Sequence, residues 1–157
     1  MKRDDRDKMH GGVRLPELVE ELGLEVIHCG ADYETALVGI KDVNRPGLQL
    51  VGYFDYFDER RLQVIGMAET QMLGGLTSEQ RKESFAALFA YSIPALVIAR
   101  GLDIFPECLE MARKYQRTLL CTKETTVDFT TNVISLLTRC LAPSITRHGV
   151  LLDIYGE

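Results

Sequence analysis

The chain of 157 residues has no apolar run that approaches the length of about 18 residues needed to cross a bilayer. It begins with a charged, polar stretch and not with the apolar core of a secretory signal. Both absences predict a protein of the cytoplasm, where cysteine thiols stay reduced. The net charge of −5 provides no basic footprint, so neither nucleic acid nor an anionic membrane is expected as a partner.

Motifs that hold nucleotides or metals are missing as well. The chain contains neither G-x-x-x-x-G-K-[ST] nor G-x-G-x-x-G, and it lacks the G-x-S-x-G and H-E-x-x-H signatures. The four cysteines, Cys29, Cys108, Cys121 and Cys140, form no C-x-x-C pair. We therefore expect no zinc site and no structural disulfide, and we find no group that would hold a nucleotide phosphate.

What is present suits one globular domain, since 46% of the residues are hydrophobic and 26% are charged. Residues 1–12 are charged, have no apolar face and end in two glycines, which predicts a disordered leader. Residues 13–142 are expected to form the domain. Residues 143–157 are expected to form a linker and a further strand, because their apolar residues alternate at period two.

Apolar patterns within the domain predict alternating strands and helices. Pro16 and Gly23 bound a short helix, and Thr77 with Gln80 forms a capping box that opens another. The continuous apolar run 95–101 is typical of a strand covered on both faces. We expect an α/β fold, a layered domain with a mostly parallel sheet flanked by helices. Strands are expected at 24–29, 36–43, 60–66, 95–101 and 118–122, and helices at 15–23, 67–73, 77–90, 105–116 and 125–141.

The stretch KDVNRPGLQLVGYFDYF, residues 41–57, is the first that could carry chemistry. It places Asp42 and Arg45 just before Gly47, and four aromatic residues within five positions follow. Because Asp and Arg beside a tight turn can bind hydroxyl or phosphate groups, Asp42, Arg45 and Gly47 are candidate substrate-binding residues. The alternative interpretation is a turn with an internal Asp42–Arg45 pair, followed by aromatic residues that pack the core or an interface.

Two histidines lie on predicted strands. His28 ends a strand and is either catalytic or a core histidine bonded to a backbone carbonyl. Its neighbour Cys29 has no basic residue beside it in sequence that would stabilise a thiolate. His148 shares an apolar face with Val150 at period two, so the pattern alone allows either a core residue or a catalytic one.

Four segments stand in a characteristic order from about Val13 onward: LVEELGLEVI, VNRPGLQLVGYFDYFDERRLQVIGMAET, PALVIARGL and LAPSITRHGVLLDIYGE. Together they resemble the N-terminal domain of bacterial HPr kinase/phosphorylase. In that family the strand at the HGV motif leads into a phosphate loop of the G-x-x-x-x-G-K-S type and a C-terminal kinase domain. This chain departs from the family pattern by stopping at Glu157, so we expect a fragment that is inactive alone.

The resemblance implies a serine kinase/phosphorylase as the parent protein. Its partner would be HPr, the phosphocarrier of the sugar phosphotransferase system, which it phosphorylates and dephosphorylates in carbon catabolite control. It implies ATP or pyrophosphate with Mg²⁺ and a homohexamer for the full-length cytoplasmic enzyme, with no cofactor and no metal held by this chain. His148 matches the histidine of the HGV motif, which implies a catalytic place near the transferred phosphate. This chain would be a regulatory or scaffold domain.

The family's N-terminal domain is similar in fold to the UDP-sugar-binding N-terminal domain of the Mur ligases. An Asp-x-Arg turn followed by glycine in those proteins is loosely matched by Asp42, Arg45 and Gly47, although Asn44 and Pro46 alter the spacing. Two other functions therefore stay open. The chain could be a stand-alone module that senses a small anionic ligand through the Asp42–Arg45 turn, or an interaction domain that pairs through the aromatic residues 53–57.

Overall fold

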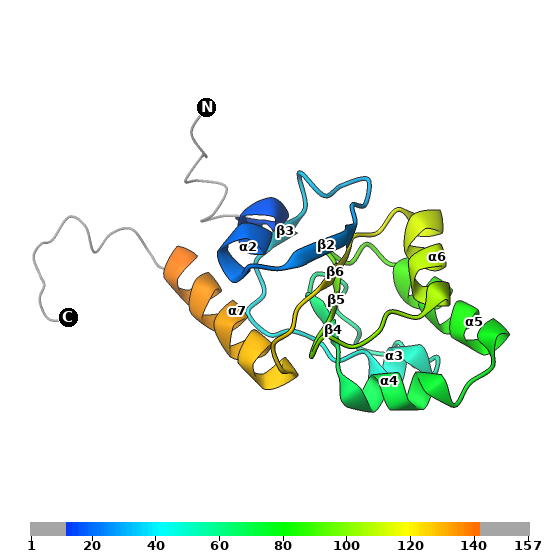
Figure 1. Cartoon of the computed structure of the whole chain (residues 1–157). Coiled ribbons are helices and arrows are strands. Elements are labelled where there is room, and N and C mark those ends of the chain that lie inside the picture. The colour runs from blue at the N-terminus through cyan, green and yellow to red at the C-terminus, as the bar shows by residue number, and fades with distance from the viewer. Residues whose placement is uncertain (1–11, 142–157) are drawn as a thin grey trace, which may run out of the picture.

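The computed structural model describes residues 12–141, which form an α/β domain with helices on both faces of a central sheet (Figure 1). The predictions for residues 1–11 and for 142–157, including the closing strand and His148, lie outside the described residues. The strands are β1 (Val13–Arg14), β2 (Glu25–His28), β3 (Leu37–Val38), β4 (Gln63–Ile65), β5 (Leu96–Ile98) and β6 (Leu119–Cys121). The helices are α2 (Leu15–Leu22), α3 (Gly47–Leu50), α4 (Met67–Gly74), α5 (Ser78–Phe89), α6 (Pro106–Tyr115) and α7 (Thr126–Cys140).

The central sheet has the strand order β2-β6-β5-β4. The pairs β4–β5 and β5–β6 are parallel, whereas β2 is an antiparallel edge strand beside β6. The prediction of a mostly parallel sheet is confirmed, with the 95–122 segment forming the expected strand–helix–strand unit. The carboxyl ends of β4, β5 and β6 meet at one edge of this sheet, which we call the carboxyl edge. Glu25 pairs with Cys121, so β2 begins at that edge too.

The predicted strand at 36–43 is largely wrong. Only Leu37–Val38 is a strand, and it pairs with β1 in a separate two-stranded sheet. Gly12, which we expected in the disordered leader, is buried. Its backbone packs against the backbone of β3, so closely that a Cβ at this position would lie 2.4 Å from the Val38 carbonyl oxygen. Farther on, Asn44 forms a parallel bridge with Gln63, so the chain reaches the main sheet only there.

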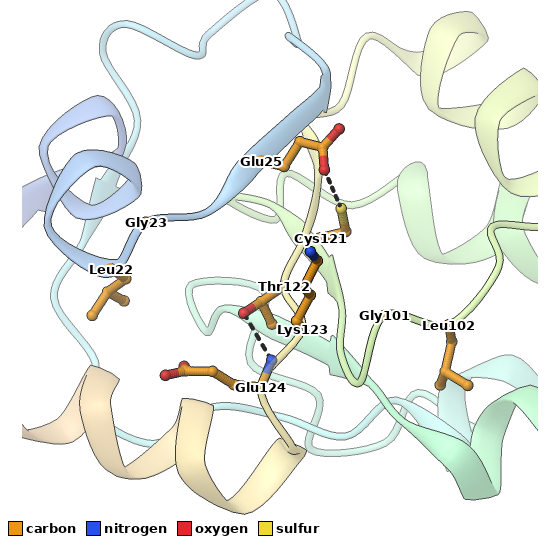
Figure 2. Close-up of a pocket in the computed structure, with 9 residues that line it drawn as sticks. All are labelled: Leu22, Gly23, Glu25, Gly101, Leu102, Cys121, Thr122, Lys123 and Glu124. Carbon is orange, nitrogen blue, oxygen red and sulfur yellow. Dashed lines mark hydrogen bonds between the residues drawn. The ribbon is translucent and has the colours of Figure 1, made fainter.

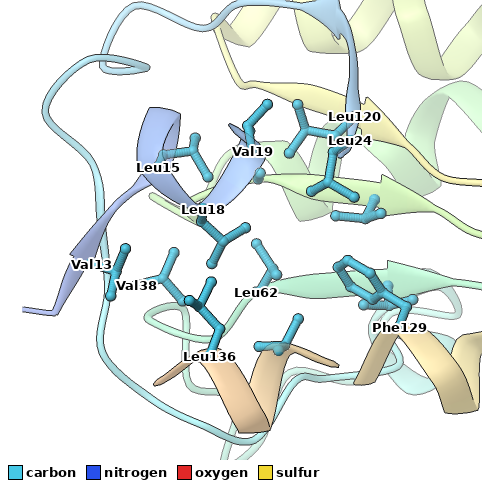
Figure 3. Close-up of a cluster of buried hydrophobic side chains, with 14 of the residues drawn as sticks. Val13, Leu15, Leu18, Val19, Leu24, Val38, Leu62, Leu120, Phe129 and Leu136 are labelled. Carbon is cyan, nitrogen blue, oxygen red and sulfur yellow. The ribbon is translucent and has the colours of Figure 1, made fainter. Parts of the chain in front are cut away.

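Two apolar cores lie on opposite faces of the sheet. Successive strand residues point to opposite faces, so Val97 and Leu120 enter one core while Leu96 and Leu119 enter the other. Helices α2 and α7 cover the first face, where Leu18, Phe129 and their neighbours converge (Figure 3). Helices α4, α5 and α6 cover the second face. This two-sided cover is why the strands read as continuous apolar runs.

Local signals set most helix ends as predicted. Gly23 ends α2 with a left-handed φ of 63°, and the Thr77 hydroxyl accepts a hydrogen bond from the Gln80 amide at the start of α5. The sequence allowed either Thr125 or Thr126 as the N-cap of α7, and the structure shows that Thr125 is the N-cap. Between residues 12 and 141, no helix is both long and apolar enough to cross a membrane.

Candidate functional site

A cleft of about 570 Å³ opens at the carboxyl edge, the place where open α/β sheets commonly bind ligands. Four segments line it: the end of α2, the start of β2, and the loops that follow β5 and β6 (Figure 2). None of these residues was singled out by the sequence as a site, apart from Cys121 as a free thiol. The lining residues are Leu22, Gly23, Glu25, Gly101, Leu102, Cys121, Thr122, Lys123 and Glu124.

Three charged side chains line the cleft without pairing to one another. Among residues 12–141, the hydrogen bond to the Glu25 side chain comes from the Cys121 thiol, at 3.5 Å between Sγ and Oε1. Oε2 of Glu124 accepts from the Asn132 amide at 3.0 Å, whereas its Oε1 is enclosed and has no hydrogen-bond partner in the described part of the chain. Lys123 is exposed and forms no ion pair with any residue of the range 12–141. The cleft therefore presents charges of both signs.

Burial raises the pKa of the Cys121 thiol, and the hydrogen bond to Glu25 and the charge of that carboxylate raise it further. A raised pKa keeps the sulfur protonated at neutral pH, and a protonated thiol is a poor nucleophile. Cys121 thus serves the cleft as a weak hydrogen-bond donor. The geometry favours ligand binding over covalent catalysis.

The backbone beside the cleft is held in an unusual conformation. Arg100 and Gly101 both have left-handed φ angles, 61° and 63°. Their amides donate across the edge, from Arg100 to the Glu124 carbonyl at 2.7 Å and from Gly101 to the Thr122 carbonyl at 2.9 Å. A non-glycine residue with positive φ is uncommon, and such residues often mark binding sites. The loops after β5 and β6 are thereby fixed to each other.

Arg45, one of the predicted binding residues, lies near the end of β4 at the same edge. Its Nη2 atom is 2.7 Å from Oε1 of Glu69, a side chain that also accepts the Gly66 amide at 2.8 Å. Burial raises the pKa of the Glu69 carboxyl, but the hydrogen bonds from Arg45 and Gly66 outweigh it and set the pKa below its ordinary value. The interpretation as an internal Asp42–Arg45 pair is wrong, because Arg45 pairs with Glu69.

The structure does not bring Asp42 or Gly47, the other two predicted binding residues, next to Arg45 and Glu69. Asp42 is exposed and forms no ion pair within the described range. Gly47 begins α3 in open space, where a Cβ would meet nothing within 4 Å. The glycine packed closely beside Arg45 is Gly66, where a Cβ would lie 2.6 Å from Thr126 Cγ2 and 2.9 Å from Arg45 Nη2, so these side chains would have to shift. The sequence signal for it was only a glycine ahead of a helix.

His28 and Cys29 lie at the opposite edge of the sheet. His28 pairs with Leu119, the first residue of β6, so it is separated from the cleft by the length of the strand. Burial, followed by the charge of Arg113, lowers the pKa of the imidazole. Its Nε2 atom is enclosed and unpartnered, so the expected bond to a backbone carbonyl is not made by this nitrogen. Cys29 is exposed.

The predicted aromatic stretch divides between packing and exposure. Phe54 stacks on Tyr91 with ring centroids 4.8 Å apart, and Phe57 meets both rings edge-on. Tyr56 is fully exposed and has a left-handed φ of 63°. The contacts among Phe54, Phe57 and Tyr91 stabilise the loop before β4, and none of these rings lines the cleft.

No group of three or more His, Cys, Asp or Glu residues among positions 12–141 could hold a metal ion. All four cysteines are free thiols, and they range from buried Cys108 to exposed Cys29.

The HPr serine kinase N-terminus family model matches residues 13–137. The chain is 42% identical over 141 residues to the HPr kinase/phosphorylase of Caldicellulosiruptor bescii, covering 90% of this chain and 45% of that protein. It is 41% identical over 144 residues to that of Alkaliphilus metalliredigens, covering 92% and 46%. The chain thus spans about half the length of the curated relatives it matches.

A solved structure shares the fold. The CBS and DRTGG domains of the regulatory region of Clostridium perfringens pyrophosphatase, complexed with the activator diadenosine tetraphosphate, align with a TM-score of 0.57. The alignment covers 85% of this chain and 51% of that one at 15% sequence identity, which shows the fold alone. The likeness to Mur ligases stays a prediction. The match over residues 13–137, with relatives about 40% identical along nine-tenths of the sequence, shows that the chain belongs to the HPr serine kinase N-terminus family.

Proposed function

We propose that this chain is the N-terminal regulatory or scaffold part of a bifunctional kinase/phosphorylase that acts on a regulatory serine of HPr. One observation carries the proposal: proteins named HPr kinase/phosphorylase match nine-tenths of this chain while the chain covers only 45–46% of them. The absence of a phosphate-loop motif from the sequence supports the view that this part does not itself hold the nucleotide phosphates.

The parent enzyme in this proposal is a cytoplasmic homohexamer that uses ATP or pyrophosphate with Mg²⁺. Its phosphate and metal ligands lie outside this chain, and His148 is the catalytic residue that this chain contributes. The histidine would stabilise or orient the transferred phosphoryl group. This chain alone is then inactive toward HPr.

An assay of phosphate transfer to HPr tests the proposal. We expect the full-length parent to phosphorylate HPr from Mg-ATP and the isolated chain to leave HPr unmodified. Transfer by the isolated chain, or a full-length parent that leaves HPr unmodified, would overturn the proposal.

The role of His148 is tested in the full-length parent. His148→Ala should lower phosphoryl transfer by roughly 10²-fold or more. His28→Ala is the matched control, since it removes a second histidine to which the proposal gives no part in the transfer. Circular dichroism must show both variants folded. Equal rates for the two variants would remove His148 from the catalytic residues.

A second function, a stand-alone ligand-sensing or interaction module with a Mur-ligase-like fold, is favoured by the cleft at the carboxyl edge. Gel analysis of the native cellular product separates the two functions. A product of this chain's length supports the module, and one about twice as long supports the kinase/phosphorylase.

A further inference from the structure

We propose that a groove between α3 and α5 docks a basic amphipathic helix of a partner protein. Aliphatic side chains of that helix would sit in the groove, and its lysine or arginine side chains would face Glu79 and Glu83. This docking is independent of the part that the chain takes in phosphate transfer. Three observations carry it: exposed apolar side chains gathered beside the groove, the apolar lining of the groove, and unpaired acidic charge along α5.

Exposed apolar side chains gather in α3 and in the turn that follows it. Of the ten large hydrophobic side chains that are exposed among residues 12–141, four are Leu48, Val51, Tyr53 and Tyr56. The backbone amides of Val51 and Tyr53 both donate to the Leu48 carbonyl oxygen, at 3.2 and 2.9 Å, so these three residues are held around one turn. Single exposed apolar residues are ordinary on a protein surface, whereas a gathering of them marks an interaction site.

The groove beside this turn has a volume of about 360 Å³. It runs along one face of α5, and the end of α3 forms its other side on the face of the sheet that α4 and α5 cover (Figure 1). Leu50, Val51, Leu76 and Ala87 give it apolar surface. An aliphatic side chain seated there removes apolar surface from water, as in other grooves that hold an amphipathic helix.

Glu83 is the one charged residue among those that line the groove. Two polar neighbours on α5 are used by the fold, because Ser84 Oγ donates to the Leu50 carbonyl oxygen at 2.6 Å and Gln80 Oε1 accepts the Thr77 amide at 2.9 Å. Glu83 is exposed and forms no ion pair with any residue from 12 to 141. The charge that a partner meets in the groove is therefore negative.

The acidic charge continues along α5. Glu79 precedes Glu83 by four residues, so the two carboxylates lie one helical turn apart on the same face. Glu79 is exposed too and has no ion pair within the described residues. Like charges at this spacing destabilise a helix, and lysine or arginine side chains one turn apart on a docked helix would relieve the repulsion. This match in spacing is the reason for assigning a helix to the partner.

The basic residues nearest in sequence do not offset this charge. Arg81 and Lys82 of α5 are paired with acidic residues of α6, at 3.0 and 3.6 Å. Arg60, in the loop after the groove, is paired with Asp58 at 3.0 Å. Nucleic acid and a membrane of acidic lipids would be repelled from Glu79 and Glu83, so charge complementarity selects a basic partner.

The test is a titration of the ¹⁵N-labelled chain, followed by amide chemical shifts, with a synthetic amphipathic helix of about 14 residues built from leucine and lysine. We expect saturable shifts at Gly52, Leu76 and Ser84, which line the groove. In one control peptide serine replaces every leucine, and in the other glutamate replaces every lysine. Each control should bind about tenfold or more weakly, because the first loses the apolar contact and the second reverses the charge.

Matched variants locate the docking surface. Val51→Ser and Glu83→Gln should each weaken binding of the leucine–lysine peptide about threefold or more. The controls are Val127→Ser on α7 and Glu21→Gln on α2, which make the same changes on the opposite face of the sheet and should leave binding unchanged. Val51 and Val127 are 65% and 71% exposed, so a difference between them reports position and not exposure. The same spectra report whether each variant is folded.

The absence of saturable shifts with the leucine–lysine peptide overturns the inference, as does equally strong binding of either control peptide. Equal effects of the groove variants and their controls overturn it too. Shifts at Gly52 and Ser84 that grow with the concentration of the chain alone would assign the groove to a second copy and would also overturn it. None of these results bears on phosphate transfer to HPr by the full-length parent, so failure of the docking surface and failure of the proposed function are distinguishable.

Discussion

Two groups of charged side chains in this domain differ in how far the protein satisfies them. Between α5 and α6, Glu107 accepts hydrogen bonds from Arg81 Nε at 3.0 Å and from Ser78 Oγ at 2.6 Å. Arg81 also donates to the carbonyl oxygens of Leu73 and Leu76, so the whole group is partnered. The hydrogen bonds from Arg81, then from Ser78, lower the pKa of Glu107 to about 2.

The cleft group behaves in the opposite way. Glu25, Lys123 and Glu124 form no ion pair with one another, and one oxygen of Glu124 has no donor among the residues from 12 to 141. A charge that is paired inside the protein links two helices, whereas an enclosed carboxylate oxygen without a donor costs free energy. The comparison separates a network in which every charged group has a partner from a group in which the charges are only partly satisfied.

The largest effect is expected from breaking the paired group. Arg81→Met leaves the buried Glu107 carboxylate without its cation and should lower the melting temperature on the order of 5 °C or more. Lys82→Met is the control, because the Lys82–Glu110 pair joins the same helices but is exposed. It should shift the melting temperature by less than about 2 °C. Equal shifts in thermal unfolding would contradict the distinction between the two pairs.

The paired group should also show a defined pH dependence. The pKa of Glu107 is about 2 in the fold and 4.5 ordinarily, so the charged form is favoured by folding. Its stabilisation is complete above about pH 5 and is lost as the pH falls from 4.5 through 2. The difference in melting temperature between the native chain and Arg81→Met should therefore be constant from about pH 7 to pH 5 and shrink below pH 4.5. A difference that stays constant down to about pH 3 would show that Glu107 is not responsible.

The smallest effect is expected in the cleft. Glu124→Gln removes a charge whose Oε1 atom lacks a donor, so the melting temperature should stay unchanged or rise by up to about 3 °C. The matched change Glu107→Gln should lower it, because it removes the negative charge that pairs with Arg81 and one of the two oxygens that accept from Arg81 and Ser78. Thermal unfolding of the two variants compares the groups directly. A similar loss of stability in both would mean that Glu124 is as structural as Glu107.

Sequence reasoning succeeded where neighbouring residues decide the structure. Gly23 ends α2 and Thr77 with Gln80 caps α5, because caps act within one helical turn. It failed at 36–43, where the apolar pattern is that of a strand but only Leu37–Val38 finds a partner, in β1. At the carboxyl edge, the sequence singled out Arg45, which the structure pairs with Glu69, and did not single out Glu25, Lys123 and Glu124, which line the cleft. In the sequence, a single charged residue at the end of a strand cannot be told from an ordinary solvent-exposed residue, because the strand order that brings such residues together is not known.

The sequence by itself determined the α/β class, most helix ends, the strands that are apolar on both faces and the family of this chain. These features could be predicted because hydrophobic periodicity, helix caps and the order of motifs can be recognised from neighbouring positions in the sequence. Only the tertiary structure decided that Arg45 pairs with Glu69, 24 residues away, and not with Asp42. It also decided that the end of α2 meets the ends of β5 and β6 around one cleft. The physical reason is that contacts between distant segments depend on strand order. Packing both faces of the sheet fixes that order, and no local preference encodes it.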